Sequence, residues 1–244
     1  MKSTRRSVIS GVAALTASFG WPAASETSAQ IRVLFIGNSF IIEHDVPSMF
    51  ADIARQAGHT IVVDMIADGG ASLSDVLADR AASDVVYTHD PDLIVLQDYS
   101  TVALYPDRAE RSHAALRAFC NLSVRRILFA TWPRAEGHKL YRREGMPSTP
   151  AEMMERVERH YTARVCPDLA GHASAQVAPV GRAWMLGTGL PLHRGDGYHA
   201  SRTGAWLSAL VLARTAGLAP DRPEPPYGVK SPGTLIRIAQ QIVP

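Results

Sequence analysis

The chain has 244 residues, of which 46% are hydrophobic and 20% are charged, and its formal net charge at pH 7 is +2. This length suits a single domain with a substantial core. Binding of nucleic acid requires a clustered basic face, and a nearly neutral charge balance gives no sign of one, so we expect no nucleic-acid partner.

The first residues have the pattern of an export signal. Lys2, Arg5 and Arg6 precede an uncharged stretch of mostly apolar or small residues, 8–21, after which small residues predominate. That order is typical of a signal peptide, and the alternative is a disordered tail. The apolar stretch is too short for a comfortable membrane span, which needs about 20 predominantly apolar residues. We therefore predict that residues 1–29 are an export signal.

The predicted location follows from this signal. The tandem arginine pair favours the twin-arginine route, but Val8 stands where that signal usually carries Phe, so the general secretory route stays open. Either route would deliver residues 30–244, as a single domain, to the periplasm or the medium without stable membrane insertion. Cys120 and Cys166 could pair in such an oxidising compartment, but each could equally be a small buried apolar residue.

Beyond the signal, short apolar runs alternate with longer segments of helical period, which is typical of βαβ units and a parallel sheet. The runs are rich in Val, Ile and Leu, as expected of strands covered on both faces. We therefore predict an α/β domain, a three-layer α/β/α sandwich around a central parallel sheet of about five strands. The candidate strands are residues 32–36, 60–66, 92–96, 126–130 and 176–180.

Helices are predicted between the strands, because apolar residues recur there every three or four positions. One apolar stripe follows Asp45, a candidate N-cap, and another follows Thr149, where Glu152 would complete a capping box. Two further helices are expected over residues 201–218 and 234–243. The two stripes consist of Val46, Met49, Phe50 and Ile53, and of Met154, Val157, Tyr161 and Val165.

The first strand ends in the sequence Gly37-Asn38-Ser39. In an open parallel sheet, ligands bind outside the carboxyl ends of the strands, so topology alone brings Ser39 to the functional edge. Gly37 permits a sharp turn and Asn38 can hydrogen-bond within it, so the loop could present the hydroxyl outward. Simple turn chemistry is the more frequent explanation of such a sequence. A nucleophilic serine also needs a base within hydrogen-bond reach.

A candidate base stands near the C-terminus, in the sequence GDGYH. Asp196 and His199 are three residues apart in a Gly-containing turn, so the carboxylate could bend back onto one imidazole nitrogen. The other nitrogen would then be free to face Ser39, as nucleophilic catalysis by serine requires.

These motifs resemble those of the SGNH (GDSL-type) hydrolases. FIGNSF is similar to the first block of that family, and DGYH is similar to the last. The resemblance implies a flavodoxin-like domain with Ser39 as the nucleophile, His199 as the general base and then acid, and Asp196 as the residue that orients His199. Asn38 stands where the family name has Asp, which leaves Ser39 and its backbone donors in place, and a departure in the third block, given next, implies a divergent bacterial branch.

The resemblance also implies an oxyanion hole. Its donors would be the backbone amide of Ser39, the amide of Gly70 in ADGGAS after the second strand, and an asparagine side chain after the third. The family pattern Gly-x-Asn-Asp is replaced here by VLQDYS, so that Gln97 would supply the primary amide. This departure leaves a second hypothesis open, namely a catalytically weakened protein of the same fold that binds carbohydrate.

A third hypothesis uses the same C-terminal residues. His193, Asp196 and His199 are regularly spaced, and imidazole–carboxylate sets can bind zinc. Gly195 and Gly197 disfavour the regular helix that such a spacing would need, and this hypothesis leaves Ser39 unexplained. We therefore favour a serine hydrolase without a metal or other cofactor.

The expected substrate is a small-molecule or carbohydrate ester. The fourth strand is followed by Trp132 and a long irregular segment at the same edge as Ser39, and Tyr99 follows the third strand. Flat aromatic faces beside polar groups suit sugar rings, and no apolar lid for long acyl chains is evident. An ordinary solvated loop with Trp132 as an anchor is an equal alternative. We expect hydrolysis of short acyl esters, including acetyl groups on carbohydrate, and the oligomeric state stays open.

Overall fold

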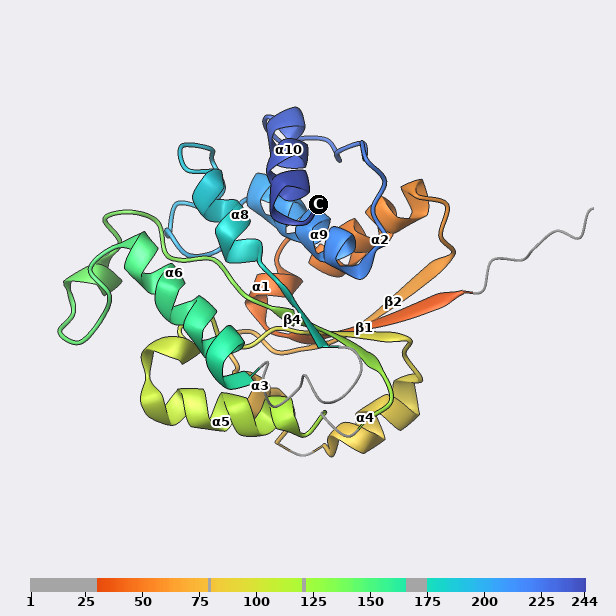
Figure 1. Cartoon of the computed structure of the whole chain (residues 1–244), viewed down its shortest axis with the longest axis horizontal. Helices are drawn as coiled ribbons and strands as arrows, with labels where there is room; N and C mark the ends of the chain where they lie inside the picture. Colours follow the sequence, from red (N-terminus) through yellow and green to blue (C-terminus); the bar gives the residue numbers. More distant parts are fainter. Residues whose placement is uncertain (1–29, 79, 120–121, 166–174) are drawn as a thin grey trace, which may run out of the picture.

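The computed structural model describes residues 30–78, 80–119, 122–165 and 175–244 (Figure 1). The predicted export signal and the two cysteines, Cys120 and Cys166, lie outside the described residues. Among the residues that are described, no helix is long and apolar enough to span a membrane.

A five-stranded sheet with all neighbours parallel forms the centre of the fold, in the order β2-β1-β3-β4-β5. All five predicted strands are confirmed, with ends shifted by at most two residues. Val180 was expected to end the fifth strand and instead begins a helix. The strands are β1 (Ile31–Gly37), β2 (Ile61–Ala67), β3 (Leu93–Leu96), β4 (Arg125–Phe129) and β5 (Ala175–Ala178).

Helices cover both faces of the sheet, so the predicted three-layer sandwich is confirmed (Figure 1). One face carries α1 (Ser39–Ile42), α2 (Val46–Gln56), α8 (Val180–Leu186), α9 (Arg202–Ala216) and α10 (Pro232–Ile242). The other carries α3 (Leu73–Val76), α4 (Ala82–His89), α5 (Pro106–Arg117) and α6 (Pro150–Arg159). Short 3₁₀ helices span Val102–Leu104 and Lys139–Arg142, and a π-helical turn spans His160–Val165.

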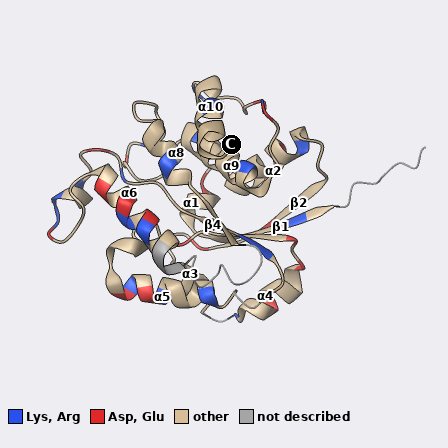
Figure 2. Ribbon diagram, in the orientation of Figure 1, with Lys and Arg blue, Asp and Glu red and all other residues tan. Residues whose placement is uncertain are grey.

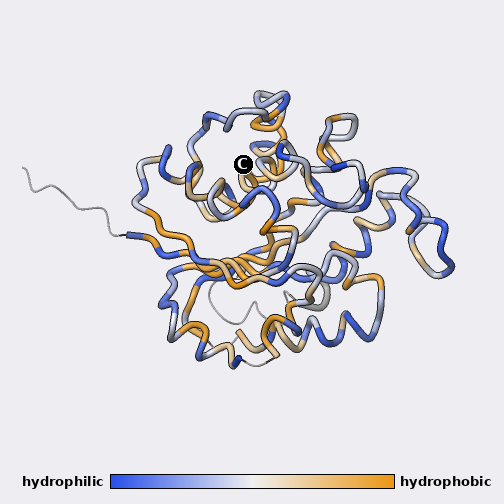
Figure 3. The backbone as a smooth tube through the Cα atoms, turned by 180° about the vertical axis from the view of Figure 1, so that it is seen from behind, coloured by the Kyte–Doolittle hydropathy of each residue, from blue (hydrophilic) through white to orange (hydrophobic). Residues whose placement is uncertain are grey.

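Alternation along the central strands builds two cores. In β1, Phe35 faces α2 and α9, whereas Leu34 faces the α5 side, because successive side chains of a strand point to opposite faces. Both are fully buried. Figure 3 shows many hydrophobic residues along the strands of the sheet, and Figure 2 shows charged residues of both signs along α5 and α6. We expected every strand to be covered on both faces. The edge strand β2 is not fully covered, since Val62 and Met65 are 40% and 43% exposed.

Capping follows the sequence closely. Asp45 accepts a hydrogen bond from the backbone N–H of Ser48, and Thr149 accepts one from the N–H of Glu152, so both predicted N-caps are confirmed. The capping box differs by one position: Glu152 Oε2 accepts from the backbone N–H of Ser148, at 2.7 Å, instead of from that of the cap residue. The helix therefore begins where expected.

Helix α9 lies in the core and begins directly after the turn that contains His199. Gly204, in the first turn of α9, lies very close to two other segments of the protein. An added Cβ would lie 2.6 Å from the Trp184 ring and would collide with the Leu192 carbonyl oxygen. Gly204 is therefore a packing requirement in this fold, and it fixes how near the start of α9 lies to α8.

We expect Gly204→Ala to lower the free energy of unfolding by about 1–3 kcal/mol, because overpacking forces neighbouring groups apart. Urea denaturation followed by circular dichroism measures this change. Gly233→Ala in α10 is the matched control, because its added Cβ meets nothing within 4 Å. That control should be neutral or stabilising by up to about 1 kcal/mol. Equal stability of Gly204→Ala and wild type would contradict the packing argument.

Candidate active site

The loop after β1 presents Ser39 at the carboxyl edge of the sheet, where α1 begins. Asn38 is the N-cap: its Oδ1 accepts from the backbone N–H of Phe40 at 3.2 Å, and its Nδ2 donates to the carbonyl oxygen of Ala71 at 2.8 Å. Asn38 is buried, whereas Ser39 is partly exposed. The asparagine thus ties the loop after β2 to the loop that carries the serine.

The residues after β3 brace both loops from the other side. Gln97 Oε1 accepts from the backbone N–H of Asn38 at 2.9 Å, and Gln97 Nε2 donates to the carbonyl oxygen of Asp98. Asp98 Oδ1 accepts from the N–H groups of Leu73 and Tyr99, at 2.9 and 2.6 Å. Gln97 has an exposed fraction of 0%. In this position its amide supports the serine loop and does not face a ligand, contrary to the expected oxyanion contact.

The structure brings Ser39, His199 and Asp196 together. Ser39 Oγ lies 3.1 Å from His199 Nε2, and His199 Nδ1 lies 2.9 Å from Asp196 Oδ2. The other carboxylate oxygen of Asp196 accepts from the backbone N–H groups of Tyr198 and His199, at 2.9 and 3.0 Å. Partial burial raises the pKa of Asp196, but these N–H groups and the imidazole lower it more, to about 2. Asp196 is therefore a carboxylate at neutral pH.

The turn that carries His199 is held to the segment after β4. Arg194 N–H donates to the His199 carbonyl oxygen at 2.9 Å, and Gly197 N–H donates to the Arg194 carbonyl oxygen at 3.0 Å. Gly197 has a φ of +73°, in the left-handed region that favours glycine. Its carbonyl oxygen accepts from the N–H of Ala135 at 2.8 Å. The turn is therefore fixed on both sides of the imidazole.

Trp132 lies in an internal aromatic stack and not at the surface. It is sandwiched between Phe40 and Trp184, with ring centroids 4.5 and 4.1 Å away and interplanar angles of 9° and 2°. Its Nε1 donates to the carbonyl oxygen of Tyr198 at 2.9 Å, and its exposed fraction is 0%. The expected contact of Trp132 with substrate is therefore wrong, and its ring positions the residue after Ser39 and the residue before His199.

Sequence reasoning gave no role to two charged residues beside the site. Glu43 Oε1 lies 3.5 Å from His199 Nε2, and Glu43 Oε2 lies 2.7 Å from Arg194 Nη1. Glu43 follows Ser39 by four positions, so helical spacing could have indicated that both share one face. Arg134, after β4, is buried beside the Tyr198 and Phe40 rings, and no sequence pattern marks it.

Gly70 and Tyr99 line one small cleft beside the Ser39 loop, with a volume of about 260 Å³. Ser72 and Arg108 also line it, and the Arg108 guanidinium lies 5.8 Å from the centre of the Tyr99 ring. Gly70 has a φ of +80° and is exposed, and Tyr99 is half-buried. Both residues are thus at the expected edge, although Ser39 does not line this cleft.

The residues of the metal hypothesis do not converge. His193 Nε2 lies 2.9 Å from the carbonyl oxygen of Pro133, and its ring packs edge-on against Trp184 with centroids 4.8 Å apart. Within the described residues, no set of three or more His, Cys, Asp or Glu side chains is arranged to hold a metal ion. The donor geometry therefore gives the alternative based on His193, Asp196 and His199 no support.

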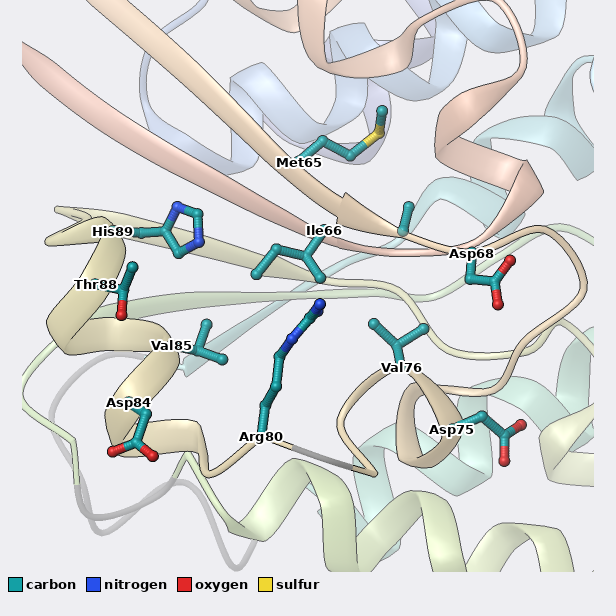
Figure 4. A pocket seen from close by; sticks show the side chains of 11 residues that line it. Met65, Ile66, Asp68, Asp75, Val76, Arg80, Asp84, Val85, Thr88 and His89 are labelled. Atoms are coloured by element: carbon teal, nitrogen blue, oxygen red, sulfur yellow. The ribbon is translucent and has the colours of Figure 1, made fainter.

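A separate pocket of about 700 Å³ lies beneath the edge strand β2, between it and helices α3 and α4 (Figure 4). Figure 4 shows the Arg80 side chain extending between Val76 and Val85 toward Ile66. None of the expected site residues lines this pocket. The chemistry predicted from the sequence thus lies at the carboxyl edge of the sheet and not here.

No protein-family model and no curated protein matches the sequence. Solved structures do match. A protein of Slackia heliotrinireducens classed as an SGNH hydrolase is 26% identical with a TM-score of 0.63, covering 77% of this chain and 100% of its own. A DUF4886 family protein of Bacteroides uniformis is 17% identical with a TM-score of 0.62, covering 87% and 94%. A variant of an acetyl xylan esterase of Geobacillus stearothermophilus is 16% identical with a TM-score of 0.58, covering 79% and 97%.

The last two likenesses concern the fold, since identity is low. The match to the Slackia protein extends over that whole chain and agrees with the five-stranded parallel sheet described above. On these grounds the chain is related to the SGNH-fold hydrolase superfamily, as its first and last sequence motifs indicated.

Proposed function

We propose that the protein is a serine hydrolase that cleaves short acyl esters through Ser39, His199 and Asp196. The observation that carries this proposal is the series of hydroxyl, imidazole and carboxylate at the carboxyl edge of the sheet, with contacts of 3.1 and 2.9 Å. Such a series allows an imidazole to take the serine proton while the carboxylate stabilises the imidazolium.

The proposed reaction is a two-step acyl transfer. Ser39 Oγ attacks the ester carbonyl carbon while His199 Nε2 accepts the hydroxyl proton. The imidazolium then gives this proton to the alcohol oxygen as the ester bond breaks, which leaves an acyl group on Ser39. Water attacks the acyl-enzyme with the same proton transfers and releases the acid. Asp196 accepts a hydrogen bond from the Nδ1–H group throughout and stays ionised, which selects the tautomer with a free Nε2 lone pair.

The oxyanion of the intermediate needs donors at the edge of the sheet. We propose the backbone N–H groups of Ser39 and Gly70, since Ser39 begins α1 and the first N–H groups of a helix have no intrahelical acceptor. The Asn38 and Gln97 side chains are committed to backbone partners. Gln97 is therefore proposed as the support of this hole instead of as one of its donors.

Support for an ester substrate comes from the related structures, which include acetyl xylan esterases. We propose short acyl esters, among them O-acetyl groups of carbohydrates. The commitment of Gln97 favours a second candidate, a weakened hydrolase that binds carbohydrate, because a side-chain oxyanion donor would then be missing. A fluorophosphonate probe distinguishes the two candidates, since only an activated serine reacts readily.

Ser39→Ala should lower kcat/KM for p-nitrophenyl acetate by at least about 10³-fold, because the nucleophile is removed. The fluorophosphonate probe should label the wild type and not this variant, and circular dichroism should be unchanged. Ser48→Ala in the adjacent α2 is the matched control and should behave like wild type. Retention of activity by Ser39→Ala would refute the proposed nucleophile.

Asp196→Asn should lower kcat by about 10⁴-fold, because an amide no longer selects the required imidazole tautomer.

The pKa of Asp196, about 2, lies below that of an unfolded Asp, about 3.9. The charged carboxylate therefore stabilises the fold above pH 4, and this contribution is lost as the pH falls toward 2. The stability advantage of wild type over Asp196→Asn should shrink below pH 4 in thermal melts. An advantage independent of pH would contradict the depressed pKa.

Gln97→Met should lower the free energy of unfolding by about 1–3 kcal/mol, because it leaves the buried N–H of Asn38 without an acceptor. Urea denaturation measures the loss, and Gln176→Met at an exposed position of β5 is the control. A fall in kcat of about 10²–10³-fold at unchanged stability would instead make Gln97 an oxyanion donor.

A further inference from the structure

Arg134 lies beside the proposed catalytic residues. Its guanidinium carbon is 4.8 Å from the centre of the Tyr198 ring and 5.8 Å from the centre of the Phe40 ring. Both rings also pack against the His199 imidazole, with centroids 4.0 and 5.7 Å away. The cation is therefore next to the residue that follows Ser39 and the residue that precedes His199.

Arg134 has no carboxylate in direct contact, although the Asp196 carboxylate attracts it from a greater distance. The residue is 7% exposed, its Nη1 is buried without a hydrogen-bond partner, and no acidic residue in the described part of the chain forms an ion pair with it. Burial disfavours its charged form and lowers its pKa. Contacts with ring faces recover only part of the hydration that a buried guanidinium loses.

Arg126, in strand β4, is a second buried arginine, and its contacts differ from those of Arg134. Arg126 is also buried, but its Nη1 donates to the carbonyl oxygens of Phe119 and Leu122, so its guanidinium has a structural use. Arg194, which is exposed, pairs with the Glu43 carboxylate. Arg134 donates to no carbonyl oxygen and pairs with no carboxylate in the described part of the chain, although it lies at the carboxyl edge of the sheet. Buried charged groups without a direct partner are concentrated at functional sites, where a ligand can supply the partner.

The backbone around Arg134 is held in place. Tyr141 donates its hydroxyl hydrogen to the Arg134 carbonyl oxygen at 2.7 Å, and the next residue, Ala135, donates its N–H to Gly197 at 2.8 Å. The guanidinium is therefore presented by a fixed segment.

Strand order indicates which part of a substrate Arg134 would meet. Ser39 follows β1, and the proposed oxyanion donor Gly70 follows β2, on one side of β1. Arg134 follows β4, on the other side. A substituent of the acyl or alcohol group, and not the oxyanion, would thus lie nearest to the guanidinium.

We propose that Arg134 binds a carboxylate of the substrate, so that esters with a carboxylate close to the scissile bond are the preferred class. This inference rests on the proposed serine hydrolase activity. The planar guanidinium fork matches a carboxylate in geometry and charge. A neutral ester would leave the guanidinium without a directly bound counter-charge.

Two matched pairs of esters test this preference, with acid release followed in a pH-stat. Monomethyl succinate is compared with methyl butyrate, and acetoxyacetate is compared with propyl acetate, so the carboxylate is on the acyl side in one pair and on the alcohol side in the other. Wild type should show at least a tenfold higher kcat/KM for the anionic member of one pair. Arg134→Met should reduce that ratio by tenfold or more.

Arg142→Met, which removes an exposed cation from the same segment, is the control and should change the ratio by less than twofold. Arg134→Lys keeps the charge without the fork, so it should give an intermediate ratio and serves if Arg134→Met does not fold. Absence of any preference in wild type would overturn the proposal. An equal loss for both members of a pair in Arg134→Met would also overturn it, because that result would indicate general positioning.

A binding measurement separates this proposal from the proposed activity. In the Ser39→Ala background, monomethyl succinate or acetoxyacetate should raise Tm, and the shift should vanish in Ser39→Ala/Arg134→Met. If wild type hydrolyses no ester and resists the fluorophosphonate probe, the hydrolase proposal fails, while this Tm shift still decides the role of Arg134. No shift with either ligand would refute the carboxylate site.

Discussion

The hydrogen bond from the Asn38 backbone N–H to Gln97 Oε1 is the interaction on which the site depends. It joins the ends of β1 and β3 in a region that water does not reach, where a polar contact is strong and its loss is costly. Asn38 extends the connection to Ala71 through its side chain, and Asp98 extends it to Leu73. These hydrogen bonds hold the loops after β1, β2 and β3 together, and Ser39 lies in the first of these loops.

The opposite wall of the site is held by aromatic packing. The stack of Phe40, Trp132 and Trp184 connects α1, the end of β4 and α8, and the Trp132 indole N–H binds the Tyr198 carbonyl oxygen. His199 follows Tyr198 directly, so the stack sets the position of the imidazole. This is how two segments 160 positions apart come to share a contact of 3.1 Å.

Local patterns in the sequence predicted the five strands, the helices α2, α6, α9 and α10, and the placement of Ser39, Asp196 and His199, because periodicity, caps and the topology of parallel sheets depend on short stretches of chain. The burial and orientation of single side chains after the strands depend on the whole fold and could not be predicted. Trp132 follows a strand as a substrate-binding aromatic would, but its ring lies inside. Gln97 has the right functional group for an oxyanion contact, yet its amide is turned toward the backbone. The sheet order also decides that Val62 is exposed.

Electrostatics connects the proposed chemistry with the proposed substrate. After attack, His199 would be an imidazolium with Asp196 at Nδ1 and with Glu43 close to Nε2, where Arg194 fixes the glutamate. The Arg134 guanidinium and this imidazole both pack against the Tyr198 ring, and no carboxylate in the described part of the chain is in direct contact with the guanidinium. A bound carboxylate would neutralise Arg134 before the proton moves. The proposed carboxylate would then lie beside the Tyr198 ring, which also packs against the His199 imidazole, so the proposed binding residue and the proposed base share one support.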